Sequence, residues 1–300
     1  MTLKLILIIT LCAPDLSVME HAYTGVMHYS VVERGTVPAE LGKSWSAPKM
    51  SGRPYLMLRP ESKANIYIRV IQGDVPADYE PMSTYGWNAT EFLVQDPDAL
   101  AELIRKPGSG FTVAGEPRPL GPNSPIRAMQ AIGPAHEVLY LTRPPEGGAM
   151  ETAHTPVDRP FILILGNRDL PATQAFLQST FGLSSGTPIA ARMTVLNKAF
   201  GLNIETTHPL TVARVSPQYS IELDQYPDAA RERPHAKGEL PPAMAMVSFE
   251  TSSLEPIKDK LLAPPQKIKQ APYDGRRTGT LRGPSGELIE LIEDAQHNEH

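Results

Sequence analysis

The chain has 300 residues, of which 41% are hydrophobic, so it can bury one large core or two of medium size. Its formal net charge of −5 argues against a nucleic-acid-binding protein, because no basic surface is available for phosphates. A single cysteine, Cys12, excludes an intramolecular disulfide framework and favours a reducing compartment.

The first thirteen residues, MTLKLILIITLCA, allow two interpretations. A charged Lys4 before an apolar run is typical of a signal peptide, but the same run can be a buried first strand. A helix from Asp15 to about Val26 and a strand over residues 29–35 are expected to follow. This strand–helix–strand order favours a first strand and a cytoplasmic protein. No run is long and apolar enough to span a membrane.

Four segments can be laid over one another as copies of one unit, which indicates an internal repeat. The first covers residues 3–71 and the second 84–144, while the third begins at Arg159 and the fourth at Ala243. Residues 133–142 align without a gap on residues 283–292, which sets Tyr140 at the position of Glu290.

The best boundary in the chain is the polar segment 145–158, PEGGAMETAHTPVD, which reads as a linker. It separates an expected N-terminal domain, 1–144, from a C-terminal domain, 159–294, and residues 295–300 form an expected tail. Within the second domain the patterns predict helices over 169–182 and 253–262, and a strand over 193–200.

The end of the chain reads as a hairpin. Residues 276–282 and 287–292 are extended runs, and Gly283-Pro-Ser-Gly286 supplies the turn between them. Strand side chains alternate between faces, so Glu290 shares a face with apolar neighbours. If that face is buried, the carboxylate needs a partner, a metal ion or a raised pKa.

This hairpin resembles the closing hairpin of the vicinal-oxygen-chelate superfamily, the glyoxalase, bleomycin-resistance and extradiol-dioxygenase-like proteins. The residues that carry the resemblance are Pro272-Tyr273-Asp274-Gly275-Arg276, followed by Gly283-Pro-Ser-Gly-Glu-Leu-Ile-Glu-Leu291. The third unit is similar to the family in its Asp169-Leu170 and Phe181-Gly182-Leu183. The resemblance implies an α+β fold of four βαβββ modules, paired into two half-barrel cups.

On that reading, residues 1–144 form one cup and 159–294 the other. The resemblance leaves open whether the cups assemble within one chain or across a homodimer.

The family's metal site gives a mixed expectation here. The glutamate at the position of Glu290 commonly binds the metal, and Glu222 occupies that position in the third unit. The usual first-strand histidines, however, are replaced by Ile162 and Met246, which argues against an iron or manganese extradiol centre. We expect Glu290 and Glu222 to face one cup, either as ligands of a divalent cation or as an acid–base pair. The alternative is that either one faces solvent.

Substrate-binding residues follow from the same layout. Arg276, beside Tyr273, is a candidate for binding a substrate carboxylate, and Met246 and Ile162 are expected to line the cup. His208 is expected near its mouth, with an ordinary surface histidine as the alternative. In the other cup the matching positions are Tyr140 and Arg127.

These observations predict an enzyme that acts on a small oxygenated metabolite, a carboxylate or a phenolic compound, by lyase or isomerase-type chemistry. One alternative is a non-catalytic small-molecule binder of the bleomycin-resistance type, and another is a divergent ring-cleavage dioxygenase. We expect neither a nucleic-acid nor a membrane partner.

Overall fold

The computed structural model describes residues 2–121, 123–148 and 150–294, so the expected tail, 295–300, lies outside the described residues. The four expected units are confirmed as four βαβββ-like modules. Their first strands are apolar on both faces, because each lies in the middle of a sheet.

The first two units have these elements. Unit one contains β1 (Leu3–Ala13), α1 (Leu16–Gly25), β2 (Tyr29–Thr36), α2 (Ala39–Ser44), the 3-10 helix η1 (Pro48–Met50), β3 (Pro54–Pro60) and β4 (Tyr67–Gln72). Unit two contains β5 (Gly86–Val94), α3 (Pro97–Ile104), β6 (Thr112–Pro119), β7 (Arg127–Ile132) and β8 (Val138–Arg143).

The other two units follow the same order. Unit three contains β9 (Val157–Asn167), α4 (Leu170–Phe181), β10 (Ile189–Arg192), α5 (Thr194–Ala199), β11 (Thr207–Ser216) and β12 (Tyr219–Gln225). Unit four contains β13 (Ala243–Thr251), the 3-10 helix η2 (Glu255–Lys260), β14 (Gln266–Lys267), β15 (Arg277–Arg282) and β16 (Leu288–Glu293).

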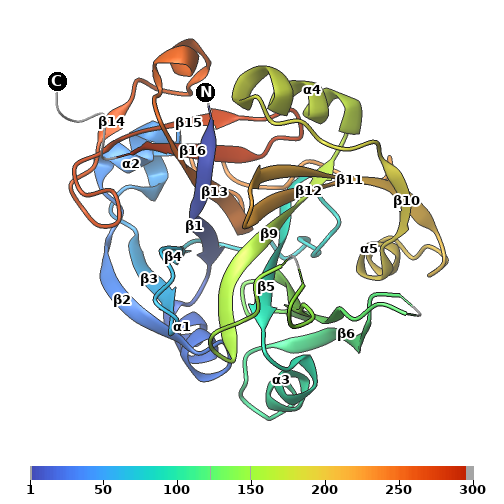
Figure 1. Ribbon diagram of the computed structural model, residues 1–300. Helices are drawn as coiled ribbons and strands as arrows, with labels where there is room; N and C mark the ends of the chain where they lie inside the picture. The colour runs from blue at the N-terminus through green and yellow to red at the C-terminus, as the bar shows by residue number, and fades with distance from the viewer. Residues whose placement is uncertain (1, 122, 149, 295–300) are drawn as a thin grey trace.

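The units pair differently from the expectation. Sheet A has the strand order β14-β15-β16-β13-β1-β4-β3-β2 and so joins units one and four. Sheet B has the order β10-β11-β12-β9-β5-β8-β7-β6 and joins units two and three (Figure 1). The expected pairing of unit one with two, and of three with four, is therefore wrong. All four units begin with a similar apolar strand, so the residue pattern does not specify which two meet.

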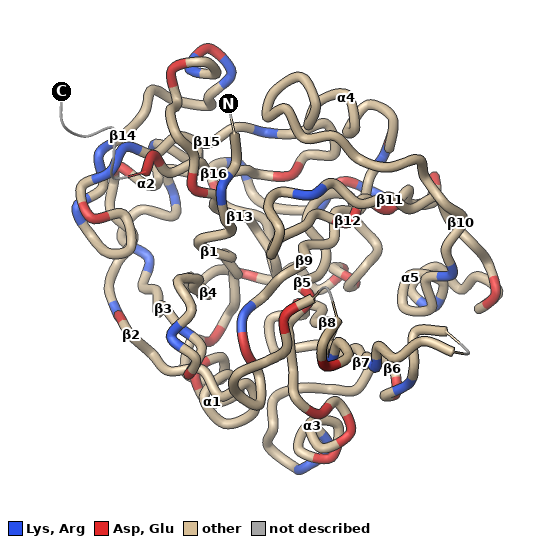
Figure 2. The backbone as a smooth tube through the Cα atoms, in the orientation of Figure 1, with Lys and Arg blue, Asp and Glu red and all other residues tan. Residues whose placement is uncertain are grey.

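Both sheets are completed within one chain. β1 runs antiparallel to β13, and β5 runs antiparallel to β9, so each sheet contains strands from both halves of the chain. The largest apolar core contains side chains from both sheets and from α1, α3 and α4. Acidic and basic positions are interspersed over the molecule (Figure 2). No helix in the described part of the chain is long and apolar enough to cross a membrane.

Local signals account for the predicted helices that are confirmed. The Asp15 carboxylate accepts hydrogen bonds from the backbone N–H groups of Ser17 and Val18, and so caps α1. Asp169 caps α4 in the same way, and Gly182 ends that helix at a φ of 70°.

Two elements differ from the sequence prediction. Residues 193–200, expected as a strand, contain α5, whose Asn197 side chain binds the carbonyls of Ile204 and Thr206. The helix expected over 253–262 is only the 3-10 helix η2. Both segments are short, so tertiary contacts outweigh local propensity.

Candidate active site

The inner face of sheet A is filled around Glu290. This carboxylate is fully buried and is surrounded by donors from four other strands or loops. Its oxygens accept hydrogen bonds from Trp45 Nε1 at 2.8 Å, Ser248 Oγ at 2.5 Å, Tyr273 OH at 2.8 Å and Arg69 Nη2 at 3.3 Å. Glu290 is thus a buried carboxylate with a complete set of protein partners.

Arg69 is the charge partner that the sequence did not reveal. It lies on β4, 1% exposed, and its Nη1 donates to the Tyr273 hydroxyl at 2.6 Å. Its Nε and Nη2 donate to Thr10 Oγ1 at 3.1 and 2.8 Å, and its guanidinium stacks on the Trp45 ring at 4.6 Å. Trp45 follows α2, which packs against the inner face of the sheet.

Glu222 lies in the other sheet, so it does not share a cup with Glu290. It stands on β12 with Asp224, and residues two apart in a strand share a face. Burial, with the charges of Asp224 and Glu91, raises the pKa of Glu222 well above its usual range. Burial also raises the pKa of Asp224 to about 8. Asp224 Oδ1 has no hydrogen-bond partner among the described residues, so no donor stabilises the ionised form at that oxygen.

Two residues of unit two complete this carboxyl cluster, which comprises Glu91, Tyr140, Glu222 and Asp224. Glu91 on β5 is the register partner of Tyr140 on β8. Burial raises the pKa of Glu91 to about 7, although Thr142 Oγ1 donates to its carboxylate at 2.5 Å. The pKa of Tyr140 is raised by burial and by the three carboxyls, so its hydroxyl stays protonated.

The cluster reaches the protein surface at Glu222. This residue is half-buried, and its neighbour across the strand pair, Val212, is 40% exposed. Ile162, expected to line a cup, is half-buried on β9 of the same sheet. The opening of the cluster is therefore flanked by apolar side chains.

The remaining predicted site residues have structural partners. His208 is buried beside α5, where its Nε2 lies 2.7 Å from Asn197 Oδ1, and burial lowers its pKa. Arg276 Nη1 lies 2.9 Å from Glu250 Oε2, and its other nitrogens donate to carbonyls of its own loop. Arg276 thus braces the loop that carries Tyr273.

The last two expected residues, Met246 and Arg127, have structural surroundings as well. Met246 is fully buried in the apolar cluster of sheet A. Arg127 forms an exposed ion pair with Asp98 and so does not join Tyr140 in a site. Sequence reasoning missed Arg69, Trp45 and Glu91; for Glu91 the signal was a lone carboxylate inside an apolar first strand.

Solved structures match nearly the whole chain. Glyoxalase I from Zea mays is 16% identical, with a TM-score of 0.64 over 96% of this chain and 92% of its own. A "putative dioxygenase" from Bacillus subtilis is 13% identical, with a TM-score of 0.62 over 98% of this chain and 86% of its own. The fold is that of the vicinal-oxygen-chelate superfamily. No family model and no curated protein sequence matches the chain.

The position of Glu290 in sheet A corresponds to the metal position of the superfamily that the sequence resembles. The residues around it decide whether a cation fits there. The two first strands and the two glutamate strands meet there at Thr10, Arg69, Ser248 and Glu290. Ser248, rather than Met246, is the first-strand residue level with Glu290. A guanidinium already neutralises the carboxylate, so these residues do not fit a cation.

The corresponding superfamily position in sheet B holds Glu91, Tyr140, Ile164 and Glu222. Ile164, rather than Ile162, is level with Glu222. Among the described residues, no group of three or more His, Cys, Asp or Glu side chains could hold a metal ion. The expectation that Glu290 and Glu222 bind one cation together is wrong, because they belong to different sheets.

Proposed function

We propose that the protein is an enzyme of the vicinal-oxygen-chelate superfamily that performs acid–base chemistry at the carboxyl cluster of sheet B. The observation that carries the proposal is the pair Glu222 and Asp224. The pKa values of both carboxyls are raised, and Glu222 lies at a partly open surface. A carboxyl whose pKa is raised binds a proton more tightly than an ordinary one, so it is suited to accept and return a substrate proton.

The roles follow from exposure and protonation. Glu222, the half-buried member, is the base that removes a proton from a C–H group next to a carbonyl, or from a phenol. Tyr140 keeps its proton and donates a hydrogen bond to the substrate oxygen as negative charge develops there. Returning the proton to another carbon gives an isomerase, and losing a leaving group gives a lyase.

The surroundings favour one of the two expected substrate classes. Three carboxyls oppose a substrate carboxylate, whereas Val212 and Ile162 suit an apolar skeleton. A phenolic or carbonyl compound is therefore the proposed substrate.

The test is proton exchange. A panel of enolisable aromatic and aliphatic carbonyl compounds is incubated with the protein in D₂O, and deuterium incorporation is followed by ¹H NMR. Glu222→Gln is expected to lose about 10²–10⁴-fold of the exchange rate. Glu205→Gln, an exposed glutamate paired with Arg192, serves as the control and is expected to change nothing.

Asp224→Asn adds a second readout. Removing the neighbouring charge lowers the pKa of Glu222, so the acidic limb of the pH–rate profile moves to lower pH. Compounds that bind without exchange in any variant would support the non-catalytic binder instead. Unchanged exchange in Glu222→Gln would refute the proposal.

A further inference from the structure

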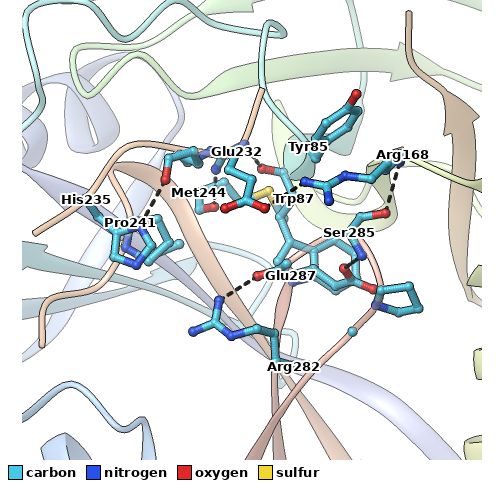
Figure 3. A pocket seen from close by; sticks show the side chains of 16 residues that line it. Tyr85, Trp87, Arg168, Glu232, His235, Pro241, Met244, Arg282, Ser285 and Glu287 are labelled. Atoms are coloured by element: carbon cyan, nitrogen blue, oxygen red, sulfur yellow. Dashed lines mark hydrogen bonds and ion pairs between the residues drawn. The ribbon is translucent and has the colours of Figure 1, made fainter. Parts of the chain in front are cut away.

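A cavity of about 420 Å³ lies where the two sheets meet, away from the carboxyl cluster. Its walls come from the start of β5, the end of β9, the connector before β13 and the turn between β15 and β16. This volume lies in the range of small-molecule sites. Figure 3 shows Arg168, Glu232 and Arg282 among the side chains that line this cavity, each from a different segment of the chain.

Arg233 gives the cavity a buried positive charge. It is 9% exposed, and its donors go to neutral acceptors: Thr84 Oγ1 at 2.9 Å, the Met244 carbonyl at 2.7 Å, and the Trp87 carbonyl and Asn88 Oδ1 at 2.5 and 3.2 Å. No carboxylate of the described chain lies within ion-pair distance of it. Buried charges normally have a counter-charge, so this guanidinium favours an anion in the cavity.

Two further guanidiniums are available to such an anion. Arg282 donates to the Gly286 carbonyl at 3.0 Å. Its charge acts on Glu232 and Glu287, but within the described ranges no carboxylate lies within ion-pair distance of it. Arg168 stacks on the Tyr85 ring at 5.0 Å and binds Glu232 at 2.8 Å. That ion pair is exposed, with Glu232 82% accessible, and exposed pairs contribute little stability. An incoming anion can therefore take the place of Glu232.

Apolar groups complete the walls. Trp87 and Met244 line the cavity together with the arginines, so its walls are partly apolar and partly cationic. We propose that this cavity binds a small organic oxyanion, a carboxylate or phosphate monoester, held by Arg168 and Arg282 in the field of Arg233. The proposal does not depend on the function proposed for sheet B.

The test is calorimetric titration with two probes, inorganic phosphate and succinate, at low ionic strength. Wild-type protein is expected to bind at least one of them, and the preferred probe identifies the source of the oxyanion. Arg168→Gln and Arg282→Gln are each expected to weaken binding about tenfold or more, because a charged hydrogen bond is lost. Glu232→Gln is expected to strengthen binding, since it removes the competing carboxylate.

Arg192 and Glu205 provide matched controls, because they form a similarly exposed ion pair elsewhere. Arg192→Gln and Glu205→Gln are expected to leave the affinity unchanged. Arg282→Gln changes an exposed side chain and is expected to fold. Its affinity for the probes can therefore be measured even if Arg168→Gln folds poorly. Absence of binding by both probes, or equal affinities in wild type, Arg168→Gln and Arg282→Gln, would overturn the proposal.

Discussion

Arg69 determines what the inner face of sheet A can hold. Its guanidinium is buried with a single carboxylate partner, Glu290. A buried ion pair adds little net stability, because desolvation offsets the attraction, but breaking it leaves one charge uncompensated. The Arg69–Glu290 pair therefore gives this position of sheet A a structural role.

Replacing Arg69 by Met tests this view of the ion pair. We expect the free energy of unfolding to fall by about 3–5 kcal/mol, because Glu290 is left buried without a counter-charge. Urea denaturation of Arg69→Met and of Arg69→Met with Glu290→Leu gives the measurement. The double variant should be less destabilised than the single one. The control Arg105→Gln, which changes an exposed side chain paired with Glu102 and Glu116, should leave stability nearly unchanged.

At the scale of elements, inserts between strands decide which sheet face stays open. In unit one, α2 and Trp45 lie between β2 and β3 and fill the inner face of sheet A. In unit three, α5 lies between β10 and β11 and packs its Val195 and Leu196 on sheet B. No tryptophan accompanies α5, and Glu222 stays half-buried beside the exposed Val212.

Truncating Trp45 measures how strongly the first insert supports sheet A. We expect Trp45→Ala to lower the free energy of unfolding by about 3–5 kcal/mol, because a 1% exposed ring leaves a cavity. Val32→Ala on β2, where the side chain is 52% exposed, is the control and should be nearly neutral. Similar urea midpoints for both variants would show that the insert is dispensable.

Elements with local signals could be predicted from the sequence. Asp15, Asp169 and Gly182 mark helix ends through their own backbone geometry, and Gly283 to Gly286 mark the last turn. That Glu290 shares a face with apolar side chains followed from strand alternation. Its partners did not, because Arg69 lies 221 residues away and reaches it only through a strand pairing that no local pattern encodes.

At the scale of the whole molecule, the pairing of units was predicted wrongly because contacts between distant strands are not encoded in any local pattern. Four similar first strands allow several combinations, and the residue pattern within one strand does not specify which two of them pair. The candidate site therefore lies in sheet B, between units two and three, rather than in a cup formed by units three and four. Glu222 was predicted as a site residue, but its neighbours come from unit two, so Glu91 and Tyr140 rather than Glu290 surround it.

Buried carboxyls set the pH dependence of global stability. The pKa values of Glu91, Glu137 and Glu287 are each raised to about 7, mainly by burial. Since their folded pKa exceeds the unfolded value of 4.5, the folded state binds more protons between these values, and stability falls as pH rises through this window.

The free energy of unfolding, measured by urea denaturation, should therefore fall between pH 5.5 and 8.5, by about 1–2 kcal/mol for each such group. Glu222 and Asp224 act in the same direction, while His208, with its lowered pKa, acts oppositely below about pH 6.5. Glu137→Gln should make the dependence less steep, because it removes one titrating group. A midpoint that rises over this range would contradict the assignment.

The strand order also dictates when each sheet can be completed during synthesis. Sheet B is formed by one continuous stretch, residues 86–225, whereas sheet A needs β1 and its neighbour β13 from opposite ends of the chain. At ~5–20 residues per second, the apolar β1 waits on the order of ten seconds or more for its partner. During that time one edge of β1 is a template for unwanted strand pairing. The nascent chain thus carries an aggregation hazard at β1 until β13 has been synthesised and has paired with it.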